Sequence, residues 1–181
     1  MVRIEGMPTP DADAPWHEIV PQLWMGGHHY SNGDGVRVPV VVGTEFDVVI
    51  SLFQADGHGP GPGVEHHHLA IPDAALQAEQ LAAARELAAI AAAAVRAHRT
   101  VMVRCHYGYN RSGLVVAQTL LDLGYTVDDA IALIRRRRSP YALNNTFFVN
   151  YLATGLGMAQ VLSDRPRCQV PQPRRSPRPG Q

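Results

Sequence analysis

One stretch, residues 101–113, constrains the fold of this chain more than any other, and it reads VMVRCHYGYNRSG. An apolar, β-branched run leads into Cys105, a five-residue loop with one glycine follows, and Arg111-Ser112 opens a run that is typical of a helix. The pattern predicts a strand, a loop and a helix in immediate succession, with a thiol where the strand ends.

This junction has the properties of an anion site. The N–H groups of a tight loop entering a helix point into one concavity, and the positive end of the helix dipole adds to their effect. The guanidinium of Arg111 presents paired donors that match two phosphoryl oxygens. The same field favours the thiolate of Cys105, which is then placed to attack phosphorus. The residues predicted to bind the phosphate are His106, Tyr107, Gly108, Tyr109, Asn110 and Arg111.

The alternative for Cys105 is a small buried hydrophobe with no chemical role. Glycine, arginine and serine stand three, six and seven places after it, at a predicted strand-to-helix junction. That combination favours a nucleophile. Ser112 is expected to donate a hydrogen bond to the sulfur when phosphate leaves, and it also suits the first turn of a helix.

The pattern C-x5-R-S after an apolar strand resembles the phosphate-binding signature of the cysteine-dependent protein phosphatases, and the order of the motifs resembles their dual-specificity branch. The similarity extends from about Trp16 to about Leu152. It includes residues 18–26, residues 70–73, the loop, and N-x-x-F-x-x-x-L beginning at Asn145. The resemblance implies an α/β fold of the protein-tyrosine-phosphatase type, a three-layer sandwich whose central, mostly parallel sheet carries helices on both faces.

The pattern along the chain agrees with an α/β fold, because predicted strands alternate with predicted helices. Residues 1–14 and 163–181 are rich in proline and charge, which predicts disorder on either side of one catalytic domain at 15–162. Strands are predicted at 16–25, 36–42, 47–52, 64–70 and 100–103, and helices at 77–97, 111–123, 127–137 and 146–161.

A phosphatase that expels an alcohol or phenol oxygen also needs an acid. Asp73 is the first candidate, because it follows a predicted strand end and a proline and stands 32 residues before Cys105, a separation that matches the resembling family. A turn or helix-capping aspartate is the alternative. Asp56, in a glycine-rich loop, is the second candidate.

The sequence departs from that family in two places. Arg104 replaces the histidine that usually precedes the nucleophile, and a cation there is expected to favour the thiolate. The loop lacks the lysines of 3-phosphoinositide phosphatases, and Gly108-Tyr109-Asn110-Arg111-Ser112 resembles the loop of RNA 5′-triphosphatases.

The predicted function is hydrolysis of phosphotyrosine in proteins, with phosphoserine and phosphothreonine as further substrates. RNA 5′-triphosphatase activity and a non-catalytic phosphate-binding module are the alternatives.

The charge distribution and the cysteine content limit which partners and which cellular compartment the sequence allows. Formal net charge is zero, but from residue 132 onward there are nine arginines and one aspartate, so contact with nucleic acid through this part is an alternative to a solvated tail. Two cysteines, Cys105 and Cys168, do not make a disulfide framework, and a reactive thiol implies a reducing compartment. The apolar run 81–95 is too short and too polar to span a membrane. We therefore expect a cytoplasmic protein without a cofactor.

Three consecutive histidines, His66 to His68, raise the question of a metal site. On a strand His66 and His68 share one face, while His67 points to the other. Two imidazoles without a third ligand do not make a catalytic zinc site, so no metal is predicted.

Overall fold

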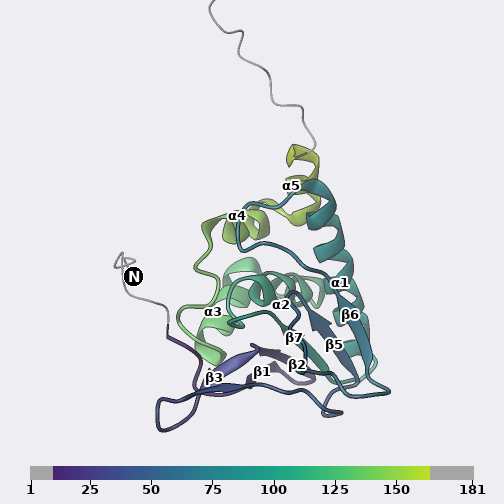
Figure 1. Ribbon diagram of the computed structural model, residues 1–181. Helices are drawn as coiled ribbons and strands as arrows, with labels where there is room; N and C mark the ends of the chain where they lie inside the picture. Colours follow the sequence, from purple (N-terminus) through teal and green to yellow (C-terminus); the bar gives the residue numbers. More distant parts are fainter. Residues whose placement is uncertain (1–9, 164–181) are drawn as a thin grey trace, which may run out of the picture.

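The computed structural model describes residues 10–163. Its centre is a five-stranded sheet in the order β1-β2-β7-β5-β6 (Figure 1). The antiparallel pair of β1 and β2 lies at one edge, and β2, β7, β5 and β6 run parallel to one another. The strands are β1 (Trp16–Val20), β2 (Leu23–Gly26), β5 (Val48–Ser51), β6 (Glu65–His68) and β7 (Val101–Arg104).

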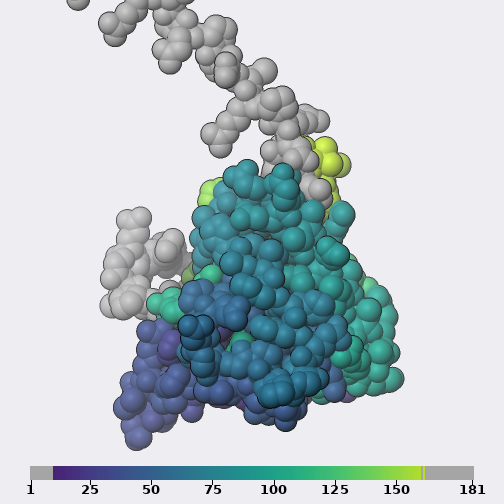
Figure 2. Space-filling view, turned by 45° about the vertical axis from the view of Figure 1, so that its right-hand side comes forward, coloured from purple at the N-terminus to yellow at the C-terminus, as the bar shows by residue number. Residues whose placement is uncertain are grey.

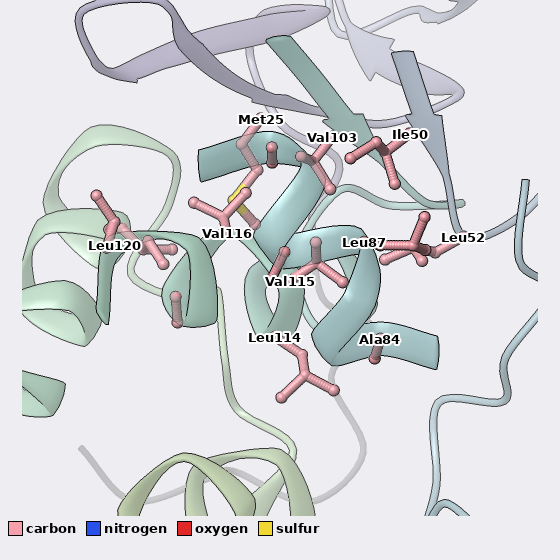
Figure 3. Close-up of a cluster of buried hydrophobic side chains, with 14 of the residues drawn as sticks. Met25, Ile50, Leu52, Ala84, Leu87, Val103, Leu114, Val115, Val116 and Leu120 are labelled. Carbon is pink, nitrogen blue, oxygen red and sulfur yellow. The ribbon is translucent and has the colours of Figure 1, made fainter. Parts of the chain in front are cut away.

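The helices pack on one face of this sheet (Figure 1). Alternate strand residues such as Ile50 and Val103 point toward α1 and α2, where Leu87, Val115 and others complete a single buried cluster (Figure 3). Fully buried alanines on one side of α1 allow it to lie close to α2 and the strands. The helices are α1 (Ala78–Arg96), α2 (Arg111–Asp122), α3 (Val127–Arg137), α4 (Thr146–Thr154) and α5 (Leu156–Ser163).

The opposite face of the sheet carries a second buried cluster, formed by Val49 and Met102 with Val40, Val42 and Phe46. None of these residues is helical: Val49 and Met102 lie in strands, and residues 40–46 form an irregular segment after a hairpin of β3 (His29–Ser31) and β4 (Arg37–Pro39). The third layer is therefore this hairpin and segment, where the prediction had helices. The glycine and proline residues of this stretch do not suit a helix, and its valines serve as the apolar cover.

Strand β7 lies in the middle of the sheet and is buried along its whole length. The following residue, Cys105, thus stands at the carboxyl end of a central parallel strand, where open α/β sheets bind ligands. The predicted α/β fold with a mostly parallel sheet is confirmed. Figure 2 shows the molecule from another side, on which residues from β5 to α1 form most of the surface.

The strand predicted at 36–42 is only three residues long, β4 (Arg37–Pro39), and three other assignments also differ from the predictions. The single strand predicted at 16–25 is a hairpin, because the chain reverses at Gln22, whose φ is +68°. The helix predicted at 146–161 is interrupted at Gly155, whose φ of +87° suits glycine. Residues 10–14, assigned to a disordered N-terminus, pack on the body of the protein, where Ala12 is buried and its carbonyl accepts a hydrogen bond from the Ser31 N–H.

The remainder of the predicted N-terminal segment, residues 1–9, lies outside the described residues, as do residues 164–181 of the predicted tail, Cys168 included. Within the part of the chain that is described, no helix is long and apolar enough to cross a membrane.

Candidate active site

Cys105 lies at the bottom of the loop that joins β7 to α2, with 2% of its surface exposed. We call residues 105–111 the Cys105 loop. The backbone nitrogen of Cys105 lies 3.4 Å from the Gly26 carbonyl oxygen, so this hydrogen bond continues the pairing of β7 with β2 by one residue. Gly108 turns the loop with a φ of +70°, and a Cβ there would lie 2.4 Å from the backbone of Gly26. This close approach requires glycine.

The carbonyl groups of the Cys105 loop are held from outside. His28 contributes two donors, its ring Nδ1 to the Cys105 oxygen at 3.0 Å and its backbone N–H to the His106 oxygen at 2.9 Å. Arg138 Nε donates to the Gly108 oxygen at 3.1 Å, and the Leu143 N–H donates to the Tyr109 oxygen at 3.3 Å.

The N–H groups of residues 106–110 make no hydrogen bond to any other described residue. The carbonyls of residues 105, 106, 108 and 109 are engaged on the outer side, and the N–H donors are left for a ligand inside the loop. Successive unpaired N–H groups at a helix N-terminus are the arrangement that binds a tetrahedral oxyanion.

Arg111 lies at the start of α2 and is oriented by backbone carbonyls. One terminal nitrogen lies 3.5 Å from the Leu52 oxygen and 3.3 Å from the Ile71 oxygen, and the guanidinium stands over the ring of Phe53. Its Nε is buried without a hydrogen-bond partner in the described structure. A buried guanidinium nitrogen without a partner is costly unless an anion binds it.

Asp73 is exposed, and both of its carboxylate oxygens accept hydrogen bonds from amide side chains. Asn110 of the loop donates to one oxygen at 3.0 Å, and Asn145 donates to the other at 2.7 Å. The structure thus brings Asp73 to the Cys105 loop across 32 residues of sequence. Asp56, the second candidate, is an exposed residue of the loop after β5 and makes no hydrogen bond to the Cys105 loop.

Ser112 is fully buried, and its Oγ lies 3.4 Å from the sulfur of Cys105. The structure thus places the Ser112 hydroxyl beside the thiol of Cys105. A hydroxyl at this distance can donate to a thiolate as charge returns to the sulfur.

Arg104 has a different place from the one expected. Its side chain points to the other face of the sheet, where it donates to Ser51 Oγ at 2.9 Å and to the carbonyls of His58 and Gly59 at 2.7 and 2.6 Å. Burial lowers the pKa of Arg104 to about 10, so it stays charged at neutral pH. Its hydrogen bonds go to the last residue of β5 and to the loop after it, and its expected effect on the thiolate stays a prediction.

Two further residues bind the loop, and neither was predicted from the sequence. His28, from the turn after β2, is fully buried, and burial lowers the pKa of its ring to about 4, so the ring is neutral with its hydrogen on the Nδ1 that faces Cys105. Arg138 lies beneath the loop, and burial lowers its pKa while the adjacent Tyr109 and Cys105 act in the opposite direction. No local motif marks them, because their contacts join distant segments.

An aromatic side chain stands next to the loop. The Phe53 ring contacts His106 at 4.9 Å between ring centroids and lies beneath Arg111 at 5.5 Å. Burial, with Arg37 and His29 nearby, lowers the pKa of His106. Of the three consecutive histidines, His66 Nε2 lies 2.9 Å from Ser51 Oγ, away from the Cys105 loop.

No protein-family model and no curated protein matches the sequence. Solved structures do match the fold. Human DUSP28 superposes with a TM-score of 0.64 at 20% sequence identity, covering 85% of this chain and 99% of its own. A mouse putative dual specificity phosphatase, solved with zinc tungstate, gives 0.63 at 22% identity over 92% of this chain and 99% of its own. Tk-PTP in its active form gives 0.57 at 23% identity over 79% and 96%. The fold is that of the dual-specificity and tyrosine phosphatases.

Proposed function

We propose that this protein is a cysteine-dependent phosphatase that hydrolyses phosphotyrosine in proteins through a phosphocysteine intermediate. One observation carries the proposal: four carbonyls of the Cys105 loop are bound from outside, and the N–H groups of residues 106–110 are unpaired within the described structure, next to a buried thiol. The fold shared with dual-specificity and tyrosine phosphatases supports it.

In the first step the sulfur of Cys105 attacks phosphorus, an S–P bond forms, and the bond from phosphorus to the tyrosine oxygen breaks. The loop N–H groups and Arg111 stabilise the charge that the equatorial oxygens carry in the transition state. Asp73 gives its proton to the departing oxygen, which leaves as the neutral phenol.

In the second step water attacks phosphorus and the S–P bond breaks. Asp73, now a carboxylate, takes a proton from this water. The carboxylic acid that began the first step is thereby restored. The electron pair of the S–P bond returns to sulfur, and Ser112 Oγ, at 3.4 Å, donates a hydrogen bond to the thiolate. Inorganic phosphate then leaves the loop.

Two features favour phosphotyrosine as the substrate. Phenylalanine at position 53 gives the site an aromatic wall beside Arg111 and His106, on which a phenyl ring can pack. Asp73 is held at the Cys105 loop, and a proton donor serves a phenol leaving group far more than a phosphoanhydride.

RNA 5′-triphosphate is the second candidate substrate because of the loop sequence Gly-Tyr-Asn-Arg-Ser. The test compares phosphate release from a phosphotyrosine peptide and from 5′-triphosphorylated RNA. The wild type is measured beside Cys105→Ser and Asp73→Ala, with Cys168→Ser as a matched change of the other cysteine.

We expect turnover of the peptide to disappear with Cys105→Ser and to fall about 10²–10⁴-fold with Asp73→Ala, while Cys168→Ser leaves it unchanged. Quenching the wild type in acid with a labelled peptide should trap the label on Cys105. Turnover of RNA alone, unaffected by Asp73→Ala, would replace the proposed substrate. Absence of Cys105-dependent release from both substrates would leave a non-catalytic phosphate-binding module.

A further inference from the structure

Three asparagines surround Asp73 and join it to two other segments of the chain. Asn110 is the residue of the Cys105 loop just before Arg111, and Asn144 and Asn145 precede α4. Together with Asp73 they are linked by four side-chain and backbone hydrogen bonds centred on Asn110, and a fifth joins Asn145 to Asp73. We call this set the amide frame.

Asn110 has no hydrogen-bonding capacity left within the amide frame. Its Nδ2 donates to Asp73 Oδ2 at 3.0 Å and to Asn144 Oδ1 at 2.9 Å. Its Oδ1 accepts from the backbone N–H groups of Asn144 and Asn145 at 3.0 and 3.2 Å. An amide has two donors and two acceptor lone pairs, so the orientation of Asn110 is fixed.

Asn145 also has two functions. Its Oδ1 accepts from the Phe147 N–H at 3.0 Å and caps α4, and its Nδ2 donates to Asp73 Oδ1 at 2.7 Å. The cap alone would explain an asparagine at this position, and serine or aspartate would serve equally well. Asparagine does both at once, because its amide offers an oxygen to the helix cap and an N–H group to the carboxylate.

We propose that Asn145, together with Asn110, is a positioning residue that fixes the carboxyl group of Asp73 for proton transfer to the leaving group. Each carboxylate oxygen has its own amide donor, one from the Cys105 loop and one from the start of α4. Rotation about the Cβ–Cγ bond would break both hydrogen bonds. The acid is therefore aligned with the same loop that aligns the phosphoryl group.

This inference rests on the proposed phosphatase function, and it has a consequence that a purely structural role lacks. Proton donation matters for a poor leaving group such as the phenol of tyrosine and matters little for an activated phenol. If Asn145 acts through Asp73, its loss should slow hydrolysis of poor leaving groups selectively. A general loosening of the fold would slow all esters alike.

The experiment measures kcat/KM for a series of aryl phosphates, from dinitrophenyl phosphate to phenyl phosphate, with wild type and Asn145→Ser. Serine keeps the cap of α4, but it is shorter and lacks the amide donor. We expect phenyl phosphate hydrolysis to fall about 10- to 100-fold, the loss that misplacing a reacting group causes. Dinitrophenyl phosphate hydrolysis should change by less than about twofold, because it needs no acid.

Two further variants control for stability and coupling. Thr126 caps α3 through its side chain, away from the Cys105 loop, so Thr126→Ala removes a helix cap without touching Asp73. It should leave the dependence on the leaving group unchanged. In an Asp73→Ala background, Asn145→Ser should have no further effect on phenyl phosphate, because the group it positions is gone.

The two possible failures are distinguishable. If the wild type shows Cys105-dependent turnover and Asn145→Ser loses activity equally on both esters, or adds its full effect to Asp73→Ala, the positioning role is refuted and the proposed function stands. If the wild type hydrolyses neither ester, the proposed function is refuted, and the positioning role with it.

Discussion

Replacing Arg104 by methionine tests why a buried arginine precedes the nucleophile. The side chain has no exposed surface, and its guanidinium makes three hydrogen bonds, to Ser51 Oγ and to the carbonyls of His58 and Gly59. These bonds hold the loop after β5 against the sheet. Methionine fills similar space but leaves all three partners without a donor.

The expected loss follows from two opposing contributions. Hydrogen bonds from a charged donor each contribute about 1.5–3 kcal/mol. Against this stands the cost of burying the guanidinium, which lowers its pKa to about 10 and corresponds to about 3 kcal/mol. We therefore expect Arg104→Met to lower the free energy of unfolding by about 1.5–6 kcal/mol, a large part of the ~5–15 kcal/mol of an ordinary domain.

Urea unfolding followed by tryptophan fluorescence measures this change, since Trp16 and Trp24 pack on the same face of the sheet as Arg104. Arg104→Lys keeps the charge but loses the fork that reaches two carbonyls, so it should also destabilise. The exposed Arg136→Met is the matched control and should change stability by less than about 0.5 kcal/mol. A loss below about 1 kcal/mol for Arg104→Met would refute this account of the residue.

Two other predictions concern the residues that hold the loop. The pKa of His28 lies near 4 in the folded protein and near 6.5 when unfolded, so protonation favours unfolding. Its contribution to stability should be complete above pH 6.5 and decline toward pH 4, and His28→Asn, which retains a donor near Nδ1, should show a shallower fall in melting temperature over this range. A fall of equal steepness would contradict the prediction. Gly108→Ala places a Cβ 2.4 Å from the backbone of Gly26 at a φ of +70°, so it should cost at least about 1–3 kcal/mol and abolish Cys105-dependent turnover. Thermal melts and phosphate release test this, and an active Gly108→Ala protein of normal stability would contradict it.

The sequence predicted well what depends on local order along the chain. Apolar β-branched runs marked β5 and β7, and alanine-rich periodicity marked α1 to within a residue at each end. The chain reversal at Gln22 and the helix break at Gly155 were not predicted, because each depends on one backbone conformation within an apolar run. The packing of a non-helical segment on the second face of the sheet was not predicted, because the valines at 36–42 are compatible with several ways of packing on a sheet.

The spacing of Cys105, Gly108, Arg111 and Ser112 determined the loop, because a strand-to-helix turn of fixed length leaves little freedom to place a thiol, a donor fork and a hydroxyl. Tertiary structure alone decided what holds that loop. His28 reaches Cys105 across 77 residues, and Asn145 reaches Asp73 across 72. Arg104, adjacent to the nucleophile in sequence, points to the other side of the sheet, because successive strand residues face opposite ways. Contacts between distant segments form only when the chain is packed, and no local pattern records them.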